Sequence, residues 1–245
     1  MQVHFIGCGD AFGSGGRFNT CFHVSGETTN FLIDCGATSL VALKRAKVDR
    51  NAIDLILVTH FHADHFGGVP FFILDAQFFA KRTRPLTIAG PAGLEAGYIR
   101  AMETAFPGSS TATRKFELSL IELRPRKTWR GQGIEVTPAL VRHGRPEGPF
   151  HAYRVAAEGR IIAYTGDTEW TDSLIEIGRD ADLFIAEAYF YEKEVPLHLS
   201  YKTLASRLPS IRPKRLVLTH MNDDMLAHAA DVAHEKAADG LAIEL

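Results

Sequence analysis

Four side chains of types that bind metal ions stand close together directly after an apolar run at residues 55–58. They are His60, His62, Asp64 and His65. Where a strand ends, the backbone can turn and point alternate side chains to one place, so His60 and His62 can share one ion. Asp64 and His65 stand further round the turn and can face a second ion. Neutral imidazole and carboxylate are ligands expected for zinc, manganese or iron.

Short β-branched runs alternate with amphipathic stretches along the chain, which indicates a layered α/β architecture. The predicted strands are 3–6, 31–34, 55–59, 86–89, 134–141, 151–156, 161–165, 183–186 and 216–219. The predicted helices are 38–47, 68–81, 91–106, 171–177, 200–208 and 225–238. Thr171 and Ser200 are candidate N-caps, and Pro91 suits a first helical turn. Loops are expected at 13–16, 107–113 and 144–149.

Composition indicates an ordinary globular protein, with 46% hydrophobic and 23% charged residues. We expect a single domain spanning residues 1–245. A cytoplasmic location is expected because the three cysteines form no CxxC pair and the chain starts without a signal-like segment. A formal net charge of −2 argues against a broad basic surface for nucleic acid. The local basic residues are expected to be solvated loop charges: Arg82, Arg84, Arg124, Arg126, Lys127 and Arg130.

The HxHxDH pattern at His60–His65 after a hydrophobic strand resembles the hallmark of the metallo-β-lactamase superfamily. That resemblance implies a four-layer αββα sandwich with its site at one edge of two packed sheets. It also implies three further ligands at strand ends. His143 would join His60 and His62 at the first ion, His220 would join Asp64 and His65 at the second, and Asp167 would bridge both.

A narrower resemblance, to tRNase Z-type phosphodiesterases, rests on several further segments. Residues 5–12 read Phe-Ile-Gly-Cys-Gly-Asp-Ala-Phe, which is similar to the opening of that branch. Glu187–Phe190 reads Glu-Ala-Tyr-Phe where the branch has Glu-Ala-Thr-Phe. His198 begins a His-Leu-Ser segment similar to the branch's His-Ser-Thr loop. The resemblance implies that His198 protonates the leaving oxygen. Exposed N–H groups of the helix beginning at Ser200 are expected to favour a phosphate oxygen there.

These residues predict a hydrolase with two divalent ions, zinc before manganese or iron, acting through a hydroxide that the ions share. Asp64 and His198 are the predicted catalytic residues, and Asp34 and Glu187 are expected to support the ligand histidines. The expected substrate is a small phosphodiester or cyclic nucleotide. The alternatives are a lactone or thioester, cleavage of tRNA at its 3′ end, or a metal-binding domain without catalysis.

The expected partners follow from the same features. Nucleic acid is not excluded but is not the expected partner, since the chain shows no long insertion resembling the arm with which full tRNase Z enzymes grip tRNA. No membrane association is expected, and a homodimer is implied by the resemblance alone. Five further histidines are expected to be structural or solvent-facing: His4, His23, His151, His228 and His234. Core packing is expected for an aromatic cluster after the motif: Phe66, Phe71, Phe72, Phe78 and Phe79.

Overall fold

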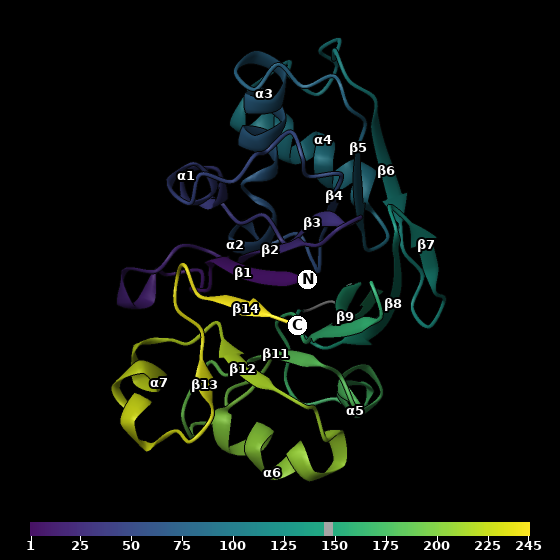
Figure 1. Cartoon of the computed structure of the whole chain (residues 1–245). Coiled ribbons are helices and arrows are strands. Elements are labelled where there is room, and N and C mark those ends of the chain that lie inside the picture. The colour runs from purple at the N-terminus through teal and green to yellow at the C-terminus, as the bar shows by residue number, and fades with distance from the viewer. Residues whose placement is uncertain (145–148) are drawn as a thin grey trace.

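Two mixed β-sheets face each other and carry helices on their outer surfaces in the computed structural model (Figure 1). The structure describes residues 1–144 and 149–245. In Figure 1 the N-terminal sheet and its helices occupy the upper half, and the later elements occupy the lower half. The C-terminal strand is an exception, because it pairs with the first strand and so belongs to the upper sheet. The predicted four-layer αββα sandwich is confirmed.

The first sheet contains seven strands and has three helices packed against its outer face. In spatial order the strands are β14 (Ala242–Glu244), β1 (Gln2–Gly7), β2 (Cys21–Ser25), β3 (Asn30–Ile33), β4 (Leu55–Leu57), β5 (Leu86–Gly90) and β6 (Leu118–Glu122). The helical elements of this half are a 3₁₀ turn (Ser14–Gly16), α1 (Ser39–Arg45), α2 (Ala63–Phe66), α3 (Val69–Phe78) and α4 (Leu94–Ala105). Side chains of α1, α3 and α4 form one apolar core with the outer face of the sheet.

The second sheet also contains seven strands and carries the later helices. Its spatial order is β13 (Glu235–Lys236), β12 (Leu216–Thr219), β11 (Leu183–Glu187), β10 (Arg160–Tyr164), β9 (Phe150–Ala157), β8 (Ile134–Val141) and β7 (Trp129–Gly131). The helical elements are α5 (Ser173–Gly178), α6 (Tyr201–Ile211), α7 (Asp223–Ala227) and a 3₁₀ turn (Ala229–Asp231). Apolar side chains of α5, α6 and α7 pack on the outer face.

Central strands are buried on both faces, which explains their nearly continuous apolar sequences. In β3, Phe31 and Ile33 enter the core between the sheets, whereas Leu32 packs under the helices of the first sheet. Successive side chains of a strand point to opposite faces, so a strand covered on both sides needs apolar residues at every position. Strands β3 to β6 run parallel, as do β10 to β13, and their carboxyl ends therefore lie at common edges.

The predicted helix 225–238 is wrong. Helix α7 ends at Ala227, a 3₁₀ turn follows, and β13 then pairs in parallel with β12. On β13, Lys236 Nζ donates to the carbonyls of Ala229 at 2.9 Å and Val232 at 3.0 Å. Pairing with the sheet edge thus outweighs the local helical preference of this alanine-rich segment.

Helix starts are only partly as predicted. Ser200 is confirmed as the N-cap of α6, where its hydroxyl accepts from the backbone N–H of Thr203 at 3.2 Å. Helix α5 instead has Asp172 at its N-cap position, and Thr171 Oγ1 contacts the Ser173 hydroxyl. Pro91 lies outside α4, which begins at Leu94 after Gly93 adopts a left-handed φ of 85°.

Two expectations about exposure are wrong. Phe71, Phe78 and Phe79 are solvent-exposed rather than in the core, because α3 and its C-cap carry apolar residues on several sides while only one side faces the sheet. Arg82 is buried rather than solvated, and its guanidinium donates to backbone carbonyls that include those of Ile53 and Arg84, both at 2.8 Å.

Of the predicted loop 144–149, residues 145–148 lie outside the described part. Within the described part no helix is long and apolar enough to cross a membrane.

Asp75 on α3 links this helix to α1 and to the segment that follows it. Its side chain is 3% exposed and pairs with Lys44 Nζ at 2.6 Å and Arg50 Nε at 2.7 Å. Burial alone would raise the pKa of Asp75, but the two cations outweigh burial and lower it. Because the folded pKa lies below the unfolded value of about 3.9, these pairs stabilise the fold above pH ~4 and lose their effect as pH falls further.

Asp75→Asn should lower the free energy of unfolding at pH 7 by about 1–3 kcal/mol, because it removes the charge that Lys44 and Arg50 contact. Urea unfolding at pH 7 and at pH 3 measures the difference. The gap between the wild type and the variant should narrow at the lower pH, where the carboxyl group becomes protonated. Asp231→Asn, which alters an exposed carboxylate, serves as the control. A gap that is equal at both pH values would contradict this role.

Candidate metal centre

Strand ends from both sheets deliver the candidate residues to one place. Asp34 follows β3 and His60 closely follows β4 in the first sheet. In the second sheet the corresponding positions lie at the end of β11 or shortly after β8, β10 and β12, and they carry the remaining candidates: His143, Asp167, Glu187 and His220. Parallel neighbours end at the same edge, so this convergence follows from topology and does not require long loops.

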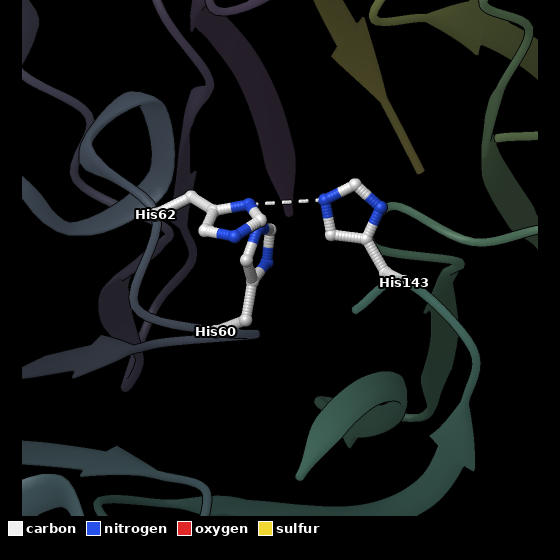
Figure 2. Close-up of side chains that lie close together, drawn as sticks. All are labelled: His60, His62 and His143. Carbon is white, nitrogen blue, oxygen red and sulfur yellow. Dashed lines mark hydrogen bonds between the residues drawn. The ribbon is translucent and has the colours of Figure 1, made fainter. Parts of the chain in front are cut away.

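Three histidines form the first group of convergent ligand atoms (Figure 2). His60 and His62 come from the turn after β4, and His143 reaches them from the end of β8. The His143 Nε2 atom lies 3.0 Å from His62 Nδ1. A tetrahedral zinc ion with Zn–N distances of about 2.0–2.1 Å holds two nitrogens roughly 3.3 Å apart, so this spacing suits a shared ion.

Neighbouring groups contact one ring nitrogen of His143 and one of His60. The His143 Nδ1–H donates to the Leu197 carbonyl at 2.8 Å, which leaves Nε2 as the acceptor. His60 Nδ1 contacts the Thr59 hydroxyl at 3.1 Å, and His60 Nε2 is buried without a hydrogen-bond partner. A buried polar atom without a partner is costly, and a cation at this position would satisfy it.

The second group contains two carboxylates and two histidines, and all four residues are buried: Asp64, His65, Asp167 and His220. The Nε2 atoms of His65 and His220 lie 3.4 Å apart. Asp167 Oδ2 lies 3.2 Å from each of these nitrogens and 3.6 Å from His143 Nε2, so it reaches both groups. The other oxygen of Asp167 is buried and has no partner.

The two groups differ in their charge. Burial lowers the pKa of His143 to about 4 and holds that of His60 well below its usual value, so both are neutral and able to bind a metal. Burial also disfavours the charged form of His220, but Asp167 and Asp64 outweigh it and raise its pKa to about 9. The carboxylates therefore draw positive charge into the second group, and a divalent cation supplies the same compensation.

Asp34 supports His65 as expected. Its Oδ2 accepts from His65 Nδ1 at 2.7 Å, and its Oδ1 accepts from the Thr59 N–H at 2.7 Å. This contact orients His65 Nε2 toward the second group. Asp34 adopts a left-handed φ of 59°, a conformation that Asp and Asn tolerate better than other non-glycine residues.

Glu187 lies beside His220, a candidate ligand, as expected, but its main contact is with His198. Its Oε1 is hydrogen-bonded to Nδ1 of His198, which lies outside the two groups just described, and it is 3.6 Å from His220 Nδ1. The other oxygen accepts from the Thr168 N–H at 2.8 Å. Glu187 thus mainly orients His198, whose ring lies 4.8 Å from that of His143.

The N-terminus of α6 does not offer the free N–H groups predicted beside His198. The N–H of Tyr201 donates to the Phe190 carbonyl at 2.8 Å, and that of Lys202 donates to the Tyr191 carbonyl at 3.0 Å. The Thr203 N–H donates to the Ser200 hydroxyl. Because the first turn is satisfied within the protein, it does not present a phosphate site, and that prediction is wrong.

Close backbone packing holds the HxHxDH turn against β3. The Cys35 N–H donates to the His65 carbonyl at 2.7 Å, and the Gly68 N–H donates to the Cys35 carbonyl at 2.9 Å. A Cβ at Gly36 would lie 2.1 Å from the Asp64 carbonyl, and one at Gly68 would lie 2.1 Å from the Gly36 carbonyl. Only glycine fits at these two positions, because the two backbone segments lie so close together.

Two contributions to this site have no obvious signal in the sequence. The Leu197 carbonyl orients His143, yet any residue has such a carbonyl; only the left-handed φ of 73° marks the position as unusual. Phe150 packs against the first group, with its ring 5.4 Å from that of His143 and 5.6 Å from that of His60. An aromatic residue at the start of a strand is too common to identify such a contact.

The chain is similar in sequence to ribonuclease Z proteins and in structure to proteins of the metallo-β-lactamase fold. Ribonuclease Z of Methanosarcina acetivorans is 27% identical over 274 aligned positions, which cover 91% of this chain and 88% of that protein. Human short-form tRNase Z superposes with a TM-score of 0.80 at 25% identity, covering 100% and 99% of the two chains. The metallo-β-lactamase-fold protein YhfI of Bacillus subtilis superposes with a TM-score of 0.78 at 22% identity, covering 99% of each chain.

These likenesses and the two ligand groups define a tRNase Z-like, metal-dependent hydrolase of the metallo-β-lactamase superfamily that binds divalent metal. Residues 1–239 match the family described as "Anti-Pycsar protein Apyc1", and the chain belongs to this family.

Asp34→Asn should weaken zinc binding by about 10- to 100-fold, because the neutral amide no longer polarises His65. The left-handed backbone tolerates Asn, so the fold should be retained. Competition with a chromogenic chelator measures the affinity. Asp75→Asn is the matched control, since it also neutralises a buried carboxylate but lies outside both ligand groups. Unchanged affinity in the Asp34 variant would refute the supporting role.

Proposed function

We propose that the chain hydrolyses phosphodiesters at a centre of two divalent ions, with His198 as the general acid. The observation that carries this proposal is the position of His198, which Glu187 holds beside two groups of convergent ligand atoms. Zinc suits the histidine and aspartate donors best, and manganese and iron also bind ligands of these types.

The proposed ligand set assigns each ion to one of the groups. His60, His62 and His143 would hold the first ion, and Asp64, His65 and His220 would hold the second. Asp167 would bridge them. Its Oδ2 lies within 3.6 Å of nitrogens from both groups, which supports this assignment. The buried partnerless atoms His60 Nε2 and Asp167 Oδ1 support it independently.

The chemistry of phosphodiester hydrolysis determines which roles fall to the metal ions and which to the side chains. Divalent ions bound here would neutralise phosphoryl charge and lower the pKa of a water to make a nucleophile. The chain itself must supply a proton to the departing alkoxide, which is a poor leaving group. His198 would donate from Nε2 while Glu187 accepts from Nδ1, so the imidazole keeps one orientation as it gives up its proton.

This proton donor favours phosphodiesters over the thioesters considered at first. A thiolate departs without protonation, so the His198–Glu187 pair would have no task in thioester hydrolysis. A lactone ring-opens to an alkoxide and would use the same donor. The lactone therefore belongs among the test substrates.

The names of the relatives support RNA as the substrate, whereas the sequence alone led us to expect a small phosphodiester. Ribonuclease Z of M. acetivorans matches this chain along most of both lengths, and human tRNase Z superposes on the whole chain. Cleavage of precursor tRNA near its 3′ end is therefore the first candidate activity.

A small phosphodiester or cyclic nucleotide is the second candidate, and two observations favour it. The alignment with the M. acetivorans protein runs over 274 positions, more than the 245 residues of this chain, so that relative carries segments that this chain lacks. The net charge of −2 also provides little attraction for a polyanion.

The zinc-loaded protein should hydrolyse at least one phosphodiester substrate faster than a lactone. The comparison uses kcat/KM for a precursor tRNA, a 3′,5′-cyclic nucleotide, bis(p-nitrophenyl) phosphate and a γ-lactone under one set of conditions. A higher value for precursor tRNA assigns RNA processing, and the reverse order assigns a small diester. A lactone turned over faster than every diester would contradict the proposed function.

His198→Ala should slow hydrolysis of an alkyl phosphodiester by about 100- to 10,000-fold, the usual contribution of general acid catalysis. It should slow a p-nitrophenyl diester much less, because p-nitrophenolate departs without a proton. Metal content, measured by atomic emission, should not change. His4→Ala is the control, since His4 lies on β1 outside the ligand groups. Equal losses on both diesters would mean that His198 positions the phosphate instead.

A further inference from the structure

We propose that Tyr189 is a positioning residue whose ring holds the imidazole of His198 in the plane required for proton donation. This inference rests on the proposed function of His198. The Tyr189 ring stacks on the His198 ring with a centroid distance of 4.2 Å and an interplanar angle of 23°.

The hydrogen bond from His198 to Glu187 does not by itself fix the imidazole. One hydrogen bond at Nδ1 still allows the ring to pivot about the line between donor and acceptor. The His198 side chain is 23% exposed, so general burial does not prevent this motion. A flat ring against its face does prevent it, and the His143 ring makes a further edge contact with the His198 ring.

The backbone of Tyr189 is fixed by hydrogen bonds to two other segments. Its N–H donates to the Leu199 carbonyl at 2.8 Å, next to His198, and its carbonyl accepts from the Asn222 N–H at 3.1 Å, soon after His220. Tyr189 therefore keeps the His198 segment in register with the strand end that carries His220. Its ring also lies 5.8 Å from the His220 ring.

The stacked face, rather than the phenol oxygen, should carry this role. Burial and neighbouring carboxylates, Asp10 and Glu187 among them, raise the pKa of Tyr189 and keep the phenol protonated. Tyr189→Phe preserves the ring and removes the hydroxyl, whereas Tyr189→Leu removes the flat face. These two variants separate the stacking contact from any chemistry of the hydroxyl group.

The first test compares the zinc-loaded wild type with both variants on an alkyl diester and a p-nitrophenyl diester. Tyr189→Leu should lower kcat on the alkyl diester by about 10- to 100-fold, a part of the general-acid contribution, with KM nearly unchanged. It should affect the p-nitrophenyl diester by less than about 3-fold, and Tyr189→Phe should stay near wild type on both. Equal losses on both substrates, no loss in the Leu variant, or a Phe variant as slow as Leu would each overturn the proposal.

A second test does not depend on activity. In the zinc-loaded protein, the stacked Tyr189 ring should shift the C–H resonances of His198 upfield in a spectrum of histidine-labelled protein. The shift should persist in Tyr189→Phe and disappear in Tyr189→Leu. A wild-type protein without the upfield shift would refute the stacking contact even if the Leu variant failed to fold. A wild-type protein that shows the shift but cleaves no phosphodiester would refute the proposed function and leave the contact in place.

Discussion

The structure depends on compensating four carboxylates buried at the meeting edges of its two sheets. They are Asp34, Asp64, Asp167 and Glu187. An ionised carboxylate without a partner is very costly in such surroundings, so each must have a cation or hydrogen-bond donors. Asp34 and Glu187 contact His65 and His198, respectively, and Asp64 and Asp167 share the ring nitrogens of the second ligand group. A bound divalent metal would complete this compensation.

Sheet topology explains how so many charged groups can meet inside a small protein. Parallel strands end at a common edge, and each such edge presents several side chains from residues far apart in the sequence. Apolar cores on both faces of each sheet fix the strands, and the strand ends inherit this rigidity. The distances between ligand atoms are therefore set by the packing of the sheets more than by the connecting loops.

Much of this organisation could be predicted from sequence, for reasons that also explain the failures. Apolar runs followed by His60 or Asp167 mark strand ends, and the HxHxDH motif predicts the fold because it is typical of one superfamily. Residues 225–238 were mispredicted because pairing with β12 is a tertiary interaction that local composition does not encode. The Leu197 carbonyl and the Tyr189 stack could not be predicted, since they depend on where segments distant in sequence come to lie.

The central claim is that this edge holds two divalent ions that share Asp167. Crystals of the zinc-loaded protein, measured on both sides of the zinc absorption edge, test it most directly. The account predicts two anomalous peaks about 3.5–4 Å apart, one among His60, His62 and His143 and one among Asp64, His65 and His220. Asp167 should contact both peaks. A single peak, or peaks away from these residues, would contradict the account.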